Sequence, residues 1–155
     1  MVTGEIFMLI LMALISIYAL YYSWTHKGKF QRLITSGFSF AIFILWLGGD
    51  LVSNLNFFLT LVFSVTTFVY ALITKQLTFF ERLTTGSLGL FLALLFAAKF
   101  LALPGAAILR VSLVIPLLLF FITNAQSSRQ DKKEFGFSLL IAFYLILELS
   151  KFITN

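Results

Sequence analysis

The stretch LNFFLTLVFSVTTFVYALI, residues Leu55–Ile73, contains no charged residue and decides the fold class of this chain. An apolar run of this length, wound as an α-helix, crosses a hydrocarbon core about 30 Å thick. A helix also satisfies its backbone N–H and C=O groups within one segment, as the bilayer requires. We therefore predict that Leu55–Ile73 is a transmembrane helix.

The composition of the whole chain also indicates a membrane protein. Of its 155 residues, 61% are hydrophobic and 11% are charged, and the mean hydropathy is +1.05. A soluble domain needs a polar surface, because apolar area exposed to water costs roughly 25 cal/mol per Å². Six acidic and eleven basic residues are too few to provide it. We predict an all-α membrane protein with one polytopic transmembrane domain, residues 1–155.

Five further apolar runs accompany the first, which gives six predicted spans. They are Ile6–Trp24, Leu33–Gly49, Leu55–Ile73, Leu83–Leu103, Ala106–Ile122 and Phe135–Phe152. The second and fifth are close to the lower length limit, so a tilted or partly interfacial segment is the alternative there. The run Ile6–Trp24 follows Glu5 instead of a basic residue, so we expect it to be a retained span and not a signal peptide.

The basic residues predict the orientation. Those in alternate links, after the first, third and fifth spans, are Lys27, Lys29, Arg32, Lys75, Arg82, Arg129, Lys132 and Lys133. The links around Gly49 and Pro104 contain no base. By the positive-inside rule both termini lie outside. Topology thus explains the net charge of +5, and we expect no nucleic-acid partner.

Short blocks of sequence recur about 50 residues apart, which indicates an internal repeat. The matching pairs are Ile17–Leu20 with Val69–Leu72, Phe30–Thr35 with Phe80–Thr85 and, more weakly, Gly37–Ser39 with Gly136–Ser138. Chance matching is the alternative, since membrane helices use few residue types. The two aligned blocks of the first pair favour duplication. We predict three tandem helical hairpins, N-out and C-out.

Ionisable residues in or near the spans are the candidate functional residues, because each costs about 3 kcal/mol in the bilayer. They are Lys99, Arg110 and Glu148 within spans, and Glu5, Asp50 and Lys151 close to span ends. The predicted topology places all six in the outer part of the molecule. No charged residue lies within the inner half of a span.

Three interpretations of this outer charge group stay open. In the first, Lys99 and Arg110 reach the headgroups with their long side chains, and Glu148 pairs with a neighbouring lysine. In the second, Arg110 and Lys99 hold an anionic headgroup, a ligand or a partner's carboxylate. Asp50 and Glu148 then balance or gate that pocket. In the third, a proton or ion path crosses the membrane.

Span hydroxyls bear on that third interpretation. Those of Ser64, Thr66, Thr67, Ser87 and Ser112 either carry water or, more often in membrane helices, bond backbone carbonyls and neighbouring helices. Small and cyclic residues predict packing features. Pro116 should kink the fifth span by freeing a carbonyl. Gly86 and Gly89 mark a face of the fourth span that another backbone approaches closely.

The run LFAAKFLALPGA, Leu95–Ala106, contains a lysine, four residues and then Pro104-Gly105, which turn the chain. It resembles the hairpin of the GldL-type gliding-motility and type 9 secretion membrane proteins of Bacteroidota, over about a quarter of the chain. Ala102-Leu103 replace that family's His-Trp, and Ala106–Ile122 lacks its acid. The resemblance implies a bacterial inner-membrane protein that packs in an assembly, without the proton-driven motor activity.

No catalytic or metal-binding set emerges from the sequence. The chain has no cysteine and one histidine, His26, so we expect no enzyme activity, no cofactor and no metal. We predict a non-enzymatic integral membrane subunit or accessory protein of a larger inner-membrane complex, with the bilayer and other membrane chains or copies of itself as partners. The alternative is a small oligomeric transporter or channel with an outward-facing charged vestibule.

Overall fold

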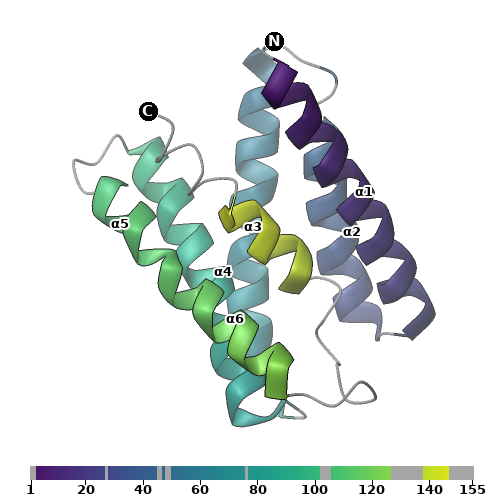
Figure 1. The fold of residues 1–155 in the computed structure, drawn as a ribbon, viewed down its shortest axis with the longest axis vertical. Helices are drawn as coiled ribbons and strands as arrows, with labels where there is room; N and C mark the ends of the chain where they lie inside the picture. Colours follow the sequence, from purple (N-terminus) through teal and green to yellow (C-terminus); the bar gives the residue numbers. More distant parts are fainter. Residues whose placement is uncertain are drawn as a thin grey trace.

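The computed structural model describes residues 3–26, 28–44, 47, 50–75, 77–101, 106–126 and 138–146. Its elements are α1 (Thr3–His26), α2 (Lys29–Ile44), α3 (Asp50–Ile73), α4 (Phe79–Phe100), α5 (Ala106–Ser112) and α6 (Val114–Gln126). An unlabelled helical segment follows at 138–146, drawn in yellow in Figure 1. No strand occurs in these ranges, so the predicted all-α class is confirmed for the part that the structure describes.

The helices pack as neighbours in chain order. Contacts join α1 to α2, α2 to α3, α3 to α4, and α4 to α5 and α6. Successive long helices run in opposite directions, and the helical segment 138–146 lies across the row (Figure 1). Its Tyr144 ring packs 5.8 Å from the Phe96 ring of α4, between centroids. The segment therefore covers the middle of the row.

Three helical stretches are long and apolar enough to cross a membrane. They are Ser53–Ile73, Phe79–Phe100 and Ile108–Ala125, which coincide with the third, fourth and fifth predicted spans. The apolar stretch of α1, Leu9–Thr25, is shorter. The chain is thus a helical protein with three described helices that fit a bilayer by length and composition.

The start of α4 lies four residues before the predicted span, at Phe79 instead of Leu83. A capping box fixes it, because the Thr78 hydroxyl accepts from the Glu81 N–H at 3.3 Å. The Glu81 carboxylate in turn accepts from the Thr78 N–H at 2.9 Å. Such reciprocal bonds satisfy two of the free donors at a helix start. Arg82 closes the turn by donating to the Thr74 carbonyl at 3.1 Å.

Glycines bring α3 and α4 close together. A Cβ placed on Gly89 would lie 2.7 Å from the Phe68 nitrogen and 2.8 Å from the Ser64 oxygen, both backbone atoms of α3. A Cβ on Gly86 would meet the Ala71 side chain at an ordinary 3.5 Å. The packing face marked by these glycines therefore lies against α3 of the same chain, with Gly89 as the tighter contact.

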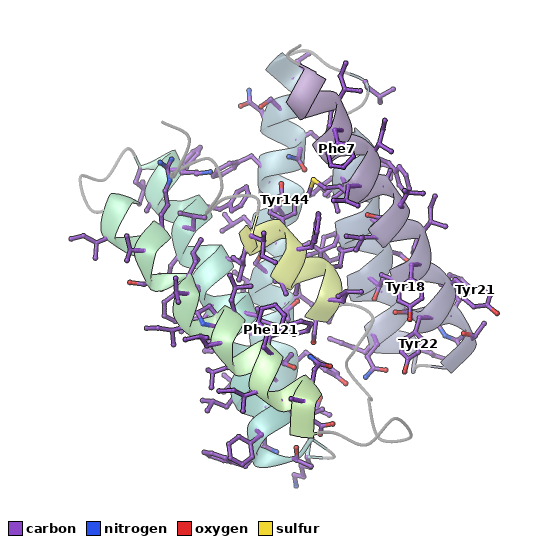
Figure 2. The ribbon with its side chains drawn as sticks, viewed as in Figure 1. Phe7, Tyr18, Tyr21, Tyr22, Phe121 and Tyr144 are labelled. Atoms are coloured by element: carbon purple, nitrogen blue, oxygen red, sulfur yellow. The ribbon has the colours of Figure 1, made fainter. Side chains whose placement is uncertain are left out.

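The core is apolar, and it is drawn mainly from α2, α4 and the helical segment 138–146. Its largest fully buried apolar side chains are Phe38, Ile34, Ile42, Leu88, Leu92, Leu95, Leu113, Leu140, Ile141 and Leu145. By contrast, α1 turns a broad apolar face outward, and Phe7 and Tyr21 are 63% and 68% exposed (Figure 2). In a bilayer such a face costs nothing, because lipid chains are as apolar as the side chains.

The two glycines of α4 provide a matched test of this packing. We expect Gly89→Ala to destabilise the protein by about 1–3 kcal/mol, because the new methyl group overlaps rigid backbone. Gly86→Ala should leave stability unchanged or raise it, since the new methyl group would make only ordinary van der Waals contacts and alanine favours helix. Thermal unfolding in detergent micelles measures both. An equal loss of stability in the two variants would contradict the close approach at Gly89.

Candidate functional site

The structure places Lys99 and Arg110 at one end of the molecule. Lys99 belongs to the last turn of α4, and Arg110 lies in α5, the next helix along the chain. We call this the Lys99 end; α1 and α3 also begin there (Figure 1). The Lys99 ammonium nitrogen is 5.4 Å from the centroid of the Phe96 ring, in cation–π geometry.

Several predicted site residues lie outside the described residues. They are Pro104, Gly105, Glu148 and Lys151. Glu5 and Asp50 belong to α1 and α3 by their backbone, but their side chains are also outside what the structure describes. The outer charge group is therefore represented by its two basic members, Lys99 and Arg110.

Arg110 is a half-buried cation whose Nε is buried without a hydrogen-bond partner. No described residue forms an ion pair with its guanidinium. It is also the one charged residue in the stretch Ile108–Ala125, where a charge is costly. A buried guanidinium donor normally finds an oxygen acceptor. Among the described charged residues, Arg110 is thus the one that most clearly lacks a hydrogen-bond acceptor or an ion-pair partner within the described part of the chain.

A helix interruption follows Arg110. The N–H of Leu113 bonds to the Arg110 carbonyl at 3.1 Å, and the helix resumes as α6 at Val114. Pro116 lies in the first turn of α6. Because proline has no N–H, the Ser112 carbonyl loses the donor that would continue the helix. This accounts for the separation of α5 from α6 at Leu113.

A second polar feature lies inside the molecule, along one face of α3. Asn56, Thr60, Ser64 and Thr67 are spaced four, four and three residues apart, and each is at most 7% exposed. The Ser64 hydroxyl donates to the Thr60 carbonyl at 2.6 Å, and that of Thr67 to the Phe63 carbonyl at 2.7 Å. The Thr60 hydroxyl lies 3.4 Å from the Asn56 side-chain oxygen. We call these four residues the α3 polar face.

Side-chain hydrogen bonds extend the α3 polar face to the neighbouring helices. At one end, the Asn56 amide donates to the Tyr144 hydroxyl at 3.5 Å, and Figure 2 shows Tyr144 on the segment that crosses α3. At the other, the Gln31 amide of α2 donates to the Tyr70 hydroxyl at 3.1 Å. Asn56 and Tyr70 are separated by about 21 Å along the helix axis. Polar contacts therefore accompany most of the length of α3.

Buried hydroxyl pairs join two further pairs of helices. The hydroxyls of Ser23 in α1 and Thr35 in α2 are 2.9 Å apart. Those of Thr84 in α4 and Thr123 in α6 are 2.6 Å apart. Hydrogen bonds of this kind, between helices in an apolar medium, hold neighbours in register. Polar contacts thus join α1 to α2, α2 to α3 and α4 to α6, whereas glycines bring α3 and α4 together.

The hydroxyls singled out from the sequence all bond backbone carbonyls of their own helices. Besides Ser64 and Thr67, Thr66 bonds the Val62 carbonyl at 2.8 Å. The remaining two also donate to carbonyls, Ser87 to Thr84 at 3.0 Å and Ser112 to Ile108 at 2.9 Å. These groups are therefore saturated as donors.

Three other buried hydroxyls have no hydrogen-bond partner. They are Ser39 of α2, Thr85 of α4 and Ser138 of the helical segment 138–146, each at most 4% exposed. An unsatisfied buried donor costs about 1–3 kcal/mol, unless a water molecule reaches it. Ser39 and Ser138 are the serines of the repeated Gly-Phe-Ser block.

Sequence reasoning missed the amide and phenol members of this interior. Hydrogen bonds between elements involve Asn56, Gln31, Tyr70 and Tyr144. A hydropathy average records these four only as polar residues that an apolar span can include. The polar residues of Leu55–Ile73 that are spaced four, four and three apart could have indicated this interior from the sequence, because that spacing places them on one helix face. Their partners on other helices had no local signal.

Comparison with protein-family models, with curated proteins and with solved structures finds no match for this chain. Among the residues that the structure describes, no three His, Cys, Asp or Glu side chains are grouped so as to hold a metal ion. The described side chains of the site offer one guanidinium, one ammonium, and buried hydroxyls and amides.

The bond between Gln31 and Tyr70 can be measured by a double-mutant cycle of Gln31→Leu and Tyr70→Phe. We expect a coupling free energy of about 0.6 to 1.7 kcal/mol, the range for hydrogen bonds between membrane helices. Tyr18→Phe is the matched control, since Tyr18 occupies the repeat position of Tyr70 but is 48% exposed. Unfolding in denaturant gives all four free energies. Zero coupling would show that this contact does not hold α2 to α3.

Proposed function

We propose that the chain is a non-enzymatic integral membrane subunit or accessory protein of a larger membrane complex. One observation carries the proposal: the five span hydroxyls that the sequence offers for a water path all bond carbonyls of their own helices. Other buried polar groups join one helix to the next, as in the Gln31–Tyr70 and Thr84–Thr123 contacts. Contacts with other chains of a complex would then be made by the exterior, namely by the broad outward face of α1 and by the Lys99 end.

The proposal includes a membrane topology. We infer six spans with both termini outside, in a bacterial inner membrane as the hairpin resemblance implies. The alternating direction of successive long helices supports this arrangement (Figure 1). So does the position of Lys29, Arg32, Lys75 and Arg82 in and beside the turns that join α1 to α2 and α3 to α4, opposite the Lys99 end. Basic residues on one side are typical of the cytoplasmic face.

One buried position shared by the first two hairpins supports the proposed internal repeat. Ala19 of α1 and Ala71 of α3 occupy the same place in the repeated block, and each is 0% exposed. A duplicated hairpin would present equivalent surfaces, which suits a subunit that packs laterally among membrane helices.

A second candidate function is a small oligomeric transporter or channel. The observation that favours it is the length of polar contacts along α3, about 21 Å between Asn56 and Tyr70. The partnerless hydroxyls of Ser39, Thr85 and Ser138 would be additional positions for water. This candidate requires the carbonyl-bound hydroxyls to exchange partners during transport.

Isolation of the tagged protein from native membranes separates the two candidates. Mild solubilisation, particle-mass determination and mass spectrometry of the companions should yield a stoichiometric, unrelated membrane protein. Its identity would then define the process. A particle that contains only this chain, as a monomer or homo-oligomer, would contradict the subunit proposal and favour the transporter or channel. A tagged Tyr18→Phe variant is a suitable control, because it removes one hydroxyl group from a side chain that is 48% exposed.

A further inference from the structure

Arg110 carries a positive charge that no described residue neutralises. Its guanidinium is half buried, its Nε has no hydrogen-bond partner, and no described residue forms an ion pair with it. It lies two residues inside the apolar stretch Ile108–Ala125, close to where the helix reaches the membrane surface. An arginine in this position extends toward the headgroups, where an anion can accept its hydrogen bonds.

The surroundings of Arg110 are apolar and open. On α5, Ile108 and Val111 are 74% and 54% exposed. At the end of the packed neighbour α4, Phe100 and Leu101 are 75% and 61% exposed. A small free anion would gain nothing from such side chains, whereas acyl chains would cover them. A cation beside exposed apolar surface therefore fits an amphiphile with a negative head.

Phosphate is the head that suits this cation best. A guanidinium presents paired donors that match two phosphate oxygens, and it is less strongly hydrated than an ammonium. Lys99 adds a second positive charge to the same end, above the Phe96 ring. The guanidinium of Arg110, which no described residue neutralises, favours a headgroup with a net negative charge over a zwitterionic one.

We propose that Arg110 binds the phosphate of an anionic phospholipid at the Lys99 end, with its acyl chains along Ile108 and Val111. Lys99 contributes charge to the same site. The inference goes beyond the proposed function, because it holds whether the chain is a subunit or a transporter. It also assigns Arg110 to lipid instead of to the carboxylate of a partner chain.

Native mass spectrometry of the delipidated protein tests the proposal by titration with phosphatidylglycerol. We expect Arg110→Gln to raise the Kd about tenfold or more, because a charge-assisted pair of hydrogen bonds is lost. Arg110→Lys should raise it less, since the charge is kept and the fork is lost. Arg82→Gln, at the opposite end, is the matched control and should leave the Kd unchanged.

Two further ligands identify the source of the anion. Diacylglycerol, which lacks phosphate, should bind far more weakly than phosphatidylglycerol, and inorganic phosphate at millimolar concentration should not displace the lipid. Thermal unfolding without lipid checks that Arg110→Gln folds, and removal of a partnerless cation should leave its midpoint unchanged or higher. An unchanged Kd in Arg110→Gln would overturn the proposal. So would displacement by inorganic phosphate, or loss of a co-purified protein with lipid binding intact.

Discussion

The close approach of α4 to the backbone of α3 at Gly89 is the constraint on which the rest of the structure depends. A side chain at this position would collide with the Ser64 carbonyl oxygen and the Phe68 nitrogen. The same stretch of α3 carries Ser64 and Thr67 of the α3 polar face, whose buried hydroxyls bond backbone carbonyls of their own helix. In an apolar medium, packing at this distance replaces the hydrophobic effect as the force between helices.

Polar contacts then decide which helices are neighbours. Lipid-facing and helix-facing surfaces are equally apolar, so apolar contact alone does not distinguish partners. The bond of Gln31 to Tyr70 specifies α2 against α3, and that of Asn56 to Tyr144 specifies the helical segment 138–146 against α3. These contacts assign a structural role to buried polar groups of α2, α3 and the helical segment 138–146. Arg110 differs from them, because its Nε is buried and no described residue accepts its hydrogen bond.

Hydropathy predicted the all-α class and the third, fourth and fifth spans, because an apolar run long enough for a bilayer has one available structure. It placed the start of α4 too late, since Thr78 and Glu81 fix that helix by hydrogen bonds that no hydropathy average detects. Tyr18 and Tyr70 show a second limit. They occupy the same repeated block, yet one is exposed on α1 and the other buried on α3. Position in the row of helices decides this, and local sequence does not record it.

The inferred topology requires that α3 and α4 cross the membrane as one antiparallel pair. The chain has no cysteine, so single cysteines introduced at the exposed positions Leu51, Lys75 and Leu101 can be labelled without background. With a membrane-impermeant maleimide on sealed vesicles, we expect Leu51→Cys and Leu101→Cys to react from one side and Lys75→Cys from the other. Labelling of all three from the same side would contradict it.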